Sequence, residues 1–516
     1  MIISGTSARV SASIFTHRRA RRLFTNAMSQ GEEFLHNFVN YEKKGVPDGA
    51  GKDDKGGFDM GRMHRLLNAL GDPHLRLPVV HVAGTKGKGS TVAMLSSIMQ
   101  AASYNVGTYT SPHVTTLRER ISINGQPIPE ASFNALIRKV ETKLVRAREE
   151  DEGALSHFEV MTALAFTHFQ DQQVDIAIVE AGLGGARDAT NVFSSDNLKL
   201  AIITAIGLEH QKALGSTLGE IAAAKAGIMK KGRPAVVARQ PEDEALQELL
   251  QRAAERGSEV IQAPDKANVA SKGIIDLEGR RQQRVVVSTR EGTSGRTDEE
   301  ADAHQSGTEV NLQLMGDHQL DNAATATAAA CLLKGDGFPQ INEDTIAEGL
   351  STASLPGRFQ VVRLPHASEQ EPPWLVLDGA HTPASAAALV KTLAQVFPGH
   401  PLAFVVGMAD DKDHSGFLAH LRDASPKAVI FTSVPIAGAQ QRSVAPGKLA
   451  AHWQAVGLQL KRPQRCRELI QASLPSAVET ARRELTSTRQ EGVGVICVCG
   501  SLHAISEALS NVQFEN

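Results

Sequence analysis

The amino-acid sequence predicts an α/β protein with a P-loop-type domain, built on a mostly parallel sheet, followed by a smaller open-sheet, Rossmann-like α/β domain. Three observations support this prediction. A buried-strand pattern, a glycine-rich loop and an amphipathic helix follow one another from Pro78 to about Tyr104. Strand-like runs then alternate with helical patterns, which is typical of a parallel sheet flanked by helices. A second block of the same kind begins near Leu355.

In the first block, which we place at residues 29–354, the run PVVHVAG reads as a buried strand before the glycine-rich loop. Further strands are expected at residues 175–180 and 200–206, and helices at residues 159–169 and 217–229. Residues from about 265 to 306 become polar, and the latter part of this segment has no apolar period. We therefore predict a polar surface insertion, the latter part of it without stable structure.

In the second block, at residues 355–516, the sequence again alternates between strand and helix patterns. Strands are expected at residues 374–377, 402–406, 428–432 and 493–498. A chain of 516 residues is too long for one compact core, so two large domains are the expected organisation.

The composition argues against several classes of partner. The net charge is −3, from 54 basic and 57 acidic residues, and this gives no overall field to attract nucleic acid or a membrane surface. No apolar stretch reaches the 18 or more residues of a spanning helix. Four scattered cysteines indicate a reducing compartment rather than a disulfide framework. We interpret Cys497 and Cys499 as core residues, because one intervening residue is fewer than zinc sites usually have.

The first 28 residues differ from the rest of the chain. They contain five arginines and several serines and threonines, and the first acidic residue is Glu32. This composition is typical of an organelle transit peptide. We expect a mitochondrial location, with the plastid or the cytoplasm as alternatives. The other interpretation is a disordered tail with incidental arginines.

The strongest functional signal is the segment Gly84-Thr85-Lys86-Gly87-Lys88-Gly89-Ser90. Between a strand and a helix, such a loop offers backbone N–H groups and a helix N-terminus to phosphate oxygens. Lys88 can reach the β- and γ-phosphates, and the Ser90 hydroxyl can meet Mg²⁺. The loop is a variant of the common G-x-x-x-x-G-K-[ST] pattern, because Val82 and Gly89 replace its first glycine and its hydroxyl residue. A glycine-rich turn with incidental lysines is the alternative.

Two further candidates follow strand-like runs. Glu180 closes the run DIAIVE, so its carboxylate is expected at the carboxyl edge of the sheet, where ligands bind. His210 lies just past another run, in GLEH. Both could help to hold Mg²⁺, although magnesium prefers oxygen ligands. His210 could equally be a capping or hydrogen-bonding histidine.

Several segments, in order along the chain, resemble those of the folylpolyglutamate and dihydrofolate synthases, which are relatives of the Mur ligases. They are HVAGTKGKGST, YTSPHVTTLRERISING, SHFEVMTALAF, EAGLGGARDATN, GLEH, LGSTLGEIAAAKAGI, GDHQLDNAATA, LPGRFQ and LDGAH. The resemblance spans about residues 34–503 apart from the polar insertion. The segments SHFE and EAGLGG look closer to the dihydrofolate synthase of plants than to the separate polyglutamating enzymes of plants.

The resemblance implies ATP and Mg²⁺ as cofactors, dihydropteroate and L-glutamate as substrates, and a set of residue roles. The implied ATP-binding residues are Gly84 to Ser90, Asn322, Arg358, Asp378 and His381, the last of which could equally be an ordinary loop histidine. The implied metal ligands are Ser90, Ser111, Glu180, His210 and Lys225, and the expected catalytic residues are Lys88, Lys225 and His210. The implied substrate-binding residues are Asp59, Met60, Pro112, His113, His157 and Phe158, with Arg118 and Arg120 on the same loop as His113.

Some of these roles have simpler alternatives. The family carbamylates the lysine that matches Lys225, but an unmodified helix lysine is the simpler interpretation. Asp59 could be a surface cap and Phe158 a core aromatic. The sequence also departs from the family pattern at Ala186, where the family usually has arginine, and at Thr382, where it often has asparagine.

The closest rival function is polyglutamation of a folate that already carries glutamate, by the same chemistry. A switch-type P-loop NTPase is the rival from another class, but it leaves the segments TSPH, KAGI and LDGAH unexplained. A pseudoenzyme is disfavoured because Ser90, Ser111, Glu180, His210 and Lys225 are all present. We expect a monomer.

Overall fold

The computed structural model describes residues 29–52, 58–277, 279–290, 307–365, 371–436, 442–460, 466–486 and 493–514. The predicted transit peptide and the latter part of the predicted polar insertion, residues 291–306, lie outside the described residues.

The N-terminal half is built on an eight-stranded sheet of order β4-β3-β2-β5-β1-β6-β7-β8. Its strands are β1 (Val79–Ala83), β2 (Val106–Tyr109), β3 (Ile121–Ile123), β4 (Gln126–Pro127), β5 (Ile176–Glu180), β6 (Leu198–Ile203), β7 (Ala235–Val237) and β8 (Val260–Gln262). The strands from β2 to β8 in this order are parallel, and only β3 and β4 run antiparallel to their neighbours. The predicted mostly parallel sheet is confirmed.

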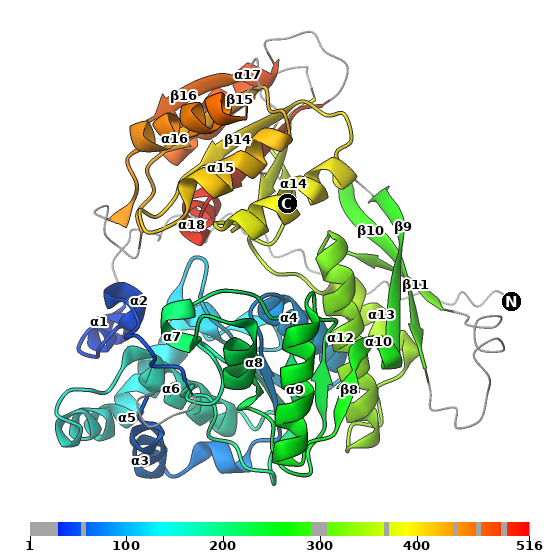
Figure 1. The fold of residues 1–516 in the computed structure, drawn as a ribbon. Coiled ribbons are helices and arrows are strands. Elements are labelled where there is room, and N and C mark those ends of the chain that lie inside the picture. Colours follow the sequence, from blue (N-terminus) through cyan, green and yellow to red (C-terminus); the bar gives the residue numbers. More distant parts are fainter. Residues whose placement is uncertain are drawn as a thin grey trace, which may run out of the picture.

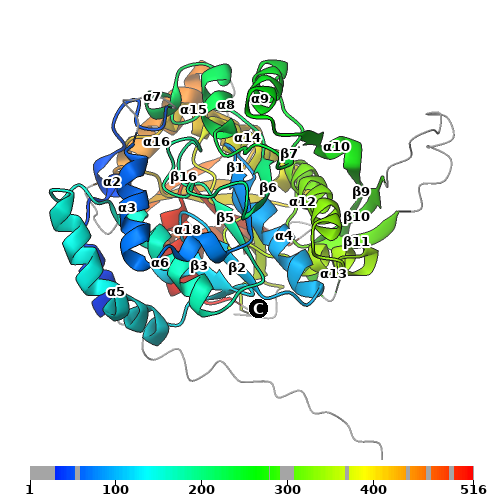
Figure 2. The same cartoon turned by 90° about the horizontal axis from the view of Figure 1, so that it is seen from below.

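Helices cover both faces of this sheet, as Figure 2 shows from below. One face carries α3 (Met60–Leu70), α5 (Glu130–Glu150) and α6 (His157–Asp171), and the other carries α4 (Lys88–Ala101), α12 (Asp317–Gly335) and α13 (Glu343–Thr352). Helices α8 (Leu218–Ala226) and α9 (Asp243–Arg256) also cover the sheet, because their buried side chains share a core with those of β6 and β7. The shorter helices of this half are α1 (Gln30–Leu35), α2 (Tyr41–Lys44), α7 (Gln211–Leu214) and α10 (Ala263–Lys266). Ser156 and Thr217 start α6 and α8 through capping boxes with Glu159 and Glu220.

A separate three-stranded antiparallel sheet has the order β11-β10-β9. Its strands are β9 (Ala267–Leu277), β10 (Arg280–Thr289) and β11 (Thr308–Leu312). The strands β9 and β10 occupy the first part of the segment predicted as a polar insertion, and the sequence did not predict them. Their buried side chains, such as Val269, Val285 and Val287, pack into the same core as the alanine-rich α12. Most other side chains of β9 are exposed, which explains the polar composition, while Ile274 packs half-buried against the core of the C-terminal half.

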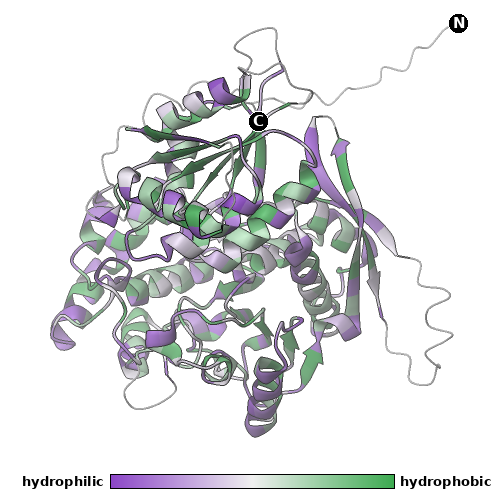
Figure 3. Cartoon of the chain, turned by 45° about the horizontal axis from the view of Figure 1, so that its top comes forward, coloured by the Kyte–Doolittle hydropathy of each residue, from purple (hydrophilic) through white to green (hydrophobic). Residues whose placement is uncertain are grey.

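The C-terminal half is a six-stranded sheet of order β12-β13-β17-β14-β15-β16, parallel except for the edge strand β12. Its strands are β12 (Gln360–Arg363), β13 (Trp374–Leu377), β14 (Leu402–Val406), β15 (Ala428–Thr432), β16 (Arg467–Gln471) and β17 (Val495–Cys499). Its helices are α14 (Pro383–Val396), α15 (His414–Asp423), α16 (Pro446–Gln459), α17 (Leu474–Thr486) and α18 (Leu502–Asn511). The four strands predicted here correspond to β13, β14, β15 and β17, and the open α/β sheet is confirmed. Figure 3 shows hydrophobic residues along its central strands.

The two halves lie one above the other, with α14 and α18 facing the N-terminal half (Figure 1). Lys391 of α14 forms an ion pair of 2.6 Å with Asp317 at the start of α12. On the opposite side, Arg442 donates a hydrogen bond of 3.1 Å to the carbonyl oxygen of Glu42 in α2. Polar contacts therefore join the halves on two sides of the space between them.

Two further findings concern the helices and the cysteines. Within the described part of the chain, no helix is both long and apolar enough to cross a membrane. Cys497 and Cys499 are free and fully buried in β17, as core residues should be.

Candidate active site

A cavity of 1590 Å³ lies between the two halves and is lined by residues of both. It brings together most residues that the sequence singled out, from Asp59 and Phe158 at one end to Asn322 and Asp378 at the other. Gly84 and Lys225 do not line the cavity and lie directly behind the glycine-rich loop. The site therefore combines the carboxyl edge of the N-terminal sheet with loops of the C-terminal half, as predicted for an open α/β sheet.

The glycine-rich loop leads from β1 into α4, as predicted. Gly84 has φ +148° and Gly87 has φ +91°, in the region that favours glycine. A Cβ at either residue would also overlap Thr204 or Asn322. The first N–H groups of α4 have no partner within the helix and are free to bind an anion at this end. The loop geometry thus fits phosphate oxygens, and Asn322 lies against it.

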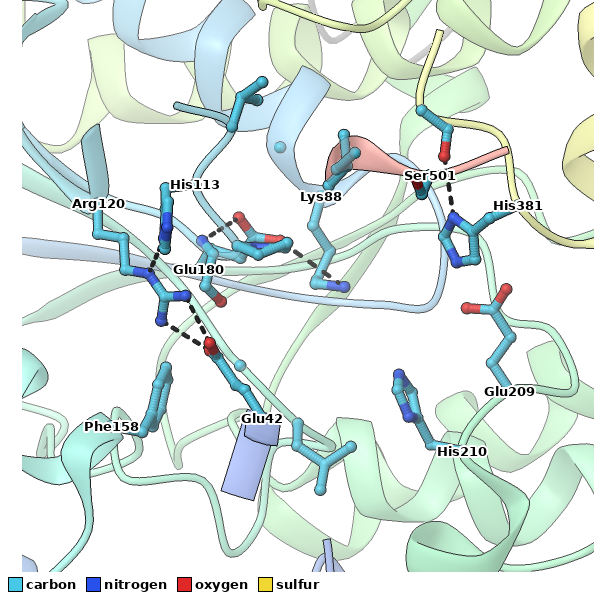
Figure 4. Close-up of a pocket in the computed structure, with 18 of the residues that line it drawn as sticks. Glu42, Lys88, His113, Arg120, Phe158, Glu180, Glu209, His210, His381 and Ser501 are labelled. Carbon is cyan, nitrogen blue, oxygen red and sulfur yellow. Dashed lines mark hydrogen bonds and ion pairs between the residues drawn. The ribbon is translucent and has the colours of Figure 1, made fainter. Parts of the chain in front are cut away.

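Lys88, Glu180 and Ser111 form one corner of the cavity. The Lys88 ammonium lies 3.7 Å from a Glu180 carboxylate oxygen and donates a hydrogen bond of 3.1 Å to the Gly84 carbonyl. The Ser111 N–H donates to the other Glu180 oxygen at 3.3 Å. Burial raises the pKa of Glu180, and Lys88 partly offsets this. Figure 4 shows the Lys88 side chain reaching into the cavity beside Glu180.

This corner has the donor chemistry that Mg²⁺ requires. A Cβ at Gly89 would lie 3.9 Å from a Glu180 oxygen, so the first turn of α4, which carries Ser90, faces the carboxylate. Glu180 and the hydroxyls of Ser90 and Ser111 are hard oxygen donors, and such sites keep several water ligands. Among the described residues, no group of three or more His, Cys, Asp or Glu could hold a metal. The residues present therefore fit a magnesium bound through one carboxylate, hydroxyls and phosphates.

His210 lies on the other side of Lys88, next to Glu209 (Figure 4). It occupies the N-cap position of α7 with φ +54°, but its side chain makes no capping hydrogen bond. The capping alternative is therefore wrong for the imidazole. Burial lowers the pKa of His210, which keeps the ring neutral and suited to a metal ligand. Glu209 forms an ion pair with Lys86, so its carboxylate neutralises the positive charge of Lys86.

Three residues of the C-terminal half face the glycine-rich loop across the cavity. Asp378, after β13, accepts hydrogen bonds of 2.8 Å from the N–H groups of Phe359 and Ala380. Burial raises the pKa of Asp378, and Arg358 opposes this shift. Asp378 thus holds together two backbone segments, one at Phe359 and one at Ala380. Arg358 and His381 face the cavity.

An apolar trench forms the opposite end of the cavity. Its walls include Phe58, Met60, Met63, Phe158 and Leu183. The Phe158 ring lies 5.9 Å from the Tyr109 ring, centroid to centroid, and a Cβ at Gly182 would overlap it. The trench can therefore take a flat, largely apolar ligand with one aromatic face exposed to it.

A buried arginine lies under this trench. Arg120 is 1% exposed, and its guanidinium forms a bidentate pair with Glu42 at 2.7 and 2.8 Å. Its Nε donates to Nδ1 of His113 at 3.1 Å. Burial and the Arg120 charge lower the pKa of His113 and of His157 to about 4, so both rings are neutral at pH 7. Arg120 thereby connects α2 to the loop that contains Ser111 and Pro112.

Asp59 has a structural role, that of a helix cap, which was the alternative interpretation from the sequence. Its carboxylate caps α3, accepting from the Gly61 N–H at 2.8 Å, and it also pairs with Arg65 at 3.3 Å. It lines the cavity, but its side chain is 54% exposed. Met60, which follows it, lies in the trench wall, so Met60 is the better placed of the two for a substrate contact.

Sequence reasoning did not single out Glu42 or Glu209. Glu42 lies in a polar segment, YEKK, that has the composition of a solvent-exposed helix. Only the fold brings it to Arg120, 78 positions away. The sequence departs from the family pattern at Ala186. Close to it, Asp188 accepts hydrogen bonds from the Leu183 N–H and from the Thr190 hydroxyl, so it shapes this loop. Arg187 lines the cavity.

Comparison with known proteins agrees with this architecture. Residues 82–330 match the Mur ligase middle domain, and residues 357–502 match the Mur ligase, glutamate ligase domain. The dihydrofolate synthase/folylpolyglutamate synthase of Bacillus subtilis is 37% identical over 376 residues, which are 72% of this chain and 80% of the relative. The dihydrofolate synthetase of Saccharomyces cerevisiae is 30% identical over 362 residues, 69% of this chain and 76% of the relative.

A solved structure extends the similarity to the whole fold. The Mycobacterium tuberculosis folylpolyglutamate synthase complexed with ADP and AMPPCP superposes with a TM-score of 0.72 at 29% identity. The match covers 89% of this chain and 96% of that chain. The chain therefore belongs to the Mur ligase family, in the branch of the folylpolyglutamate and dihydrofolate synthases, and is an ATP-dependent ligase.

Proposed function

We propose that this chain is a dihydrofolate synthase, which joins L-glutamate to 7,8-dihydropteroate with ATP and Mg²⁺ and releases dihydrofolate, ADP and phosphate. The proposal rests above all on one cavity that connects the Lys88–Glu180 corner to the trench beside Phe158. A pterin ring stacked in the trench would direct its carboxylate end toward the glycine-rich loop. The Saccharomyces relative named dihydrofolate synthetase supports the choice of acceptor.

The residues suggest how the reaction proceeds. The dihydropteroate carboxylate attacks the γ-phosphorus of ATP and forms an acyl phosphate, while ADP leaves with the bridging oxygen. The glutamate amine then attacks the acyl carbon, and phosphate leaves as the amide forms. Glu180, with the hydroxyls of Ser90 and Ser111, would hold Mg²⁺, which would supply charge neutralisation at the phosphates. Lys88 and the first N–H groups of α4 stabilise the negative charge of the transferring group, which in phosphoryl transfer provides most of the acceleration. No protein nucleophile is needed.

Polyglutamation of tetrahydrofolate is the second candidate, because relatives named folylpolyglutamate synthase share the fold. The two activities differ in the acceptor, because tetrahydrofolate already carries a glutamate and has a more reduced pterin than dihydropteroate. The test is phosphate release by the full-length chain with ATP, Mg²⁺ and glutamate, with dihydropteroate or tetrahydrofolate as acceptor. We expect release with dihydropteroate. Release with tetrahydrofolate alone would move the assignment to polyglutamation, and release without any acceptor would favour a switch-type NTPase.

We further propose that residues 1–28 direct the chain to mitochondria and that the enzyme acts as a monomer. The support for the leader is its arginine-rich composition without acidic residues. A fusion of these residues to a fluorescent protein should appear in mitochondria, and a cytosolic signal would overturn the proposal. Light scattering of the purified chain should give the mass of one copy, and a dimer mass would contradict the second part.

A further inference from the structure

A chain of buried polar side chains connects the strand before the glycine-rich loop to the loop after β5. His81, in the middle of β1, is fully buried, and its Nε2 lies 2.8 Å from the hydroxyl oxygen of Thr190. That hydroxyl oxygen lies 2.5 Å from a carboxylate oxygen of Asp188. Thr190 and Asp188 are buried as well, so bulk water does not compete for these contacts.

The direction of these hydrogen bonds follows from the carboxylate. Asp188 accepts from the Leu183 N–H at 2.7 Å, from the Thr190 N–H at 3.0 Å and from the Thr190 hydroxyl. Because the hydroxyl gives its only proton to Asp188, it accepts from His81, so Nε2 of His81 carries the proton. Burial lowers the pKa of His81 to about 3, and the ring is therefore neutral at pH 7.

The other ring nitrogen of His81 has no such contact. Its Nδ1 is buried and has no hydrogen-bond partner among the described residues. The remaining residues of β1 are valines and an alanine. An apolar side chain at position 81 would avoid the cost of an unpaired buried nitrogen. The hydrogen bond from Nε2 to Thr190 is therefore what a histidine adds at this position.

The loop at the end of this polar chain forms one wall of the apolar trench. Gly182 and Leu183 line the cavity, and Gly182 lies directly against the Phe158 ring. Asp188 holds Leu183 through its backbone N–H. The position of this wall therefore depends on the Asp188 carboxylate and on the groups that hold that carboxylate in place.

The strand is held more firmly than the loop. In β1, His81 pairs with Val179 of β5 on one side and with Ala201 of β6 on the other. Residues 181–191 contain neither helix nor strand. Loss of the Thr190 hydroxyl should therefore release the loop and leave the strand, with the glycine-rich loop that follows it, in place.

On the basis of the ligase function proposed above, we propose that His81 and Thr190 are positioning residues for the acceptor substrate. Through Asp188 they hold the trench wall at Leu183 at the distance that a pterin ring requires from the opposite, aromatic wall. Neither His81 nor Thr190 lines the cavity, so both act through Asp188 and touch no substrate themselves.

Thr190→Val tests this proposal, because valine has a shape close to that of threonine but forms no side-chain hydrogen bond. KM for dihydropteroate should rise about tenfold, as for the loss of one hydrogen bond to a charged group, while KM for ATP changes less than about twofold. Thr190→Ser keeps the hydroxyl and should have a KM for dihydropteroate near that of the wild type. An unchanged KM for dihydropteroate in Thr190→Val would overturn the proposal.

His81→Leu removes the other end of the same chain and leaves Thr190 paired with Asp188. It should raise KM for dihydropteroate without lowering the melting temperature, because it also removes the unpaired Nδ1. It therefore decides the question even if Thr190→Val does not fold. The double variant should have the KM of Thr190→Val alone, since both changes act on one hydrogen-bonded unit. Multiplied effects would show that His81 does not act through Thr190.

The matched control is Thr167→Val. Thr167 is also buried, but its hydroxyl donates to the Ala163 carbonyl within α6 at 2.8 Å, and it does not line the cavity. It should change neither KM. If Thr190→Val raised both KM values together with a fall in melting temperature, the role would be structural only and the proposal would be overturned.

Failure of the proposed function would look different. A wild type that turns over only tetrahydrofolate would refute the dihydrofolate synthase assignment. The same comparison of KM values, made with that acceptor, would still test His81 and Thr190.

Discussion

The ammonium of Lys225, in α8, donates a hydrogen bond of 2.7 Å to the carbonyl oxygen of Gly84, at the start of the glycine-rich loop. Lys88 donates to the same oxygen from the other side at 3.1 Å. Burial, with the nearby charge of Lys88, lowers the pKa of Lys225 to about 7. A large fraction of Lys225 is therefore a neutral amine at physiological pH, which is the form that reacts with carbon dioxide to give a carbamate.

This environment leads to a prediction for Lys225. Lys225→Glu should keep measurable turnover, because it supplies a carboxylate in place of a carbamate, whereas Lys225→Ala should lose it. Wild-type enzyme freed of carbon dioxide should lose activity and regain it with bicarbonate. Phosphate release measures all three. Full activity in Lys225→Ala would remove the carbamate role.

A second prediction concerns Lys88, which faces both Glu180 and the phosphate-binding end of α4. Lys88→Ala should lower turnover by about 10³-fold, comparable to the loss of a transition-state donor. Lys139→Ala is the control, because Lys139 pairs with Asp171 on the surface at 2.6 Å. Near-normal turnover in Lys88→Ala would refute the assignment of Lys88.

A third prediction tests the trench. In Gly182→Ala the new methyl group would lie within 3.0 Å of three atoms of the Phe158 ring, so the ring must move. KM for dihydropteroate should rise while KM for ATP changes little, as steady-state kinetics with each substrate varied would show. Gly335→Ala is the control, since a Cβ there meets nothing within 4 Å. An unchanged KM for dihydropteroate would mean that Phe158 does not contact the acceptor.

A fourth prediction concerns the pair of Glu42 and Arg120. Burial alone would raise the pKa of Glu42, but the hydrogen bonds and charge of Arg120 lower it, so the ion pair is formed at pH 7. Glu42→Gln leaves the fully buried guanidinium without its counter-charge. Because the Glu42 side chain is 47% exposed, we expect a loss of only about 1–2 kcal/mol in the free energy of unfolding.

Urea unfolding of the wild type, of Glu42→Gln and of the control Glu150→Gln would measure this loss of stability. Glu150→Gln removes an exposed pair with Arg146 and should leave the midpoint unchanged. If Glu42→Gln behaved like Glu150→Gln, the pair would not anchor α2 to the loop at Arg120.

The sequence predicted the parts of the fold whose pattern is local. The buried strands β1, β5 and β13 to β15 are short apolar runs, and their predicted limits agree with the structure to within a few residues. The strands β9 and β10 were not predicted, because one face of that sheet is exposed and its residues are mostly polar. Their buried side chains pack against α12, which follows later in the chain.

The same distinction applies to the site. The glycine-rich loop carries its function in consecutive residues, so the sequence identified it. Glu42 becomes a site residue only because folding pairs it with Arg120, and Glu209 only because folding brings it to Lys86 of the glycine-rich loop. Asp59 matched a family position, but the structure shows its carboxylate occupied in capping α3.

The most direct test of the proposed function is a competition assay. The full-length chain is given ATP, Mg²⁺ and glutamate with equal concentrations of dihydropteroate and tetrahydrofolate, and mass spectrometry counts the two glutamylated products. Their ratio reports the ratio of kcat/KM for the two acceptors. A dihydrofolate synthase should yield almost only dihydrofolate. Predominant diglutamylated tetrahydrofolate would contradict the proposal and identify a folylpolyglutamate synthase.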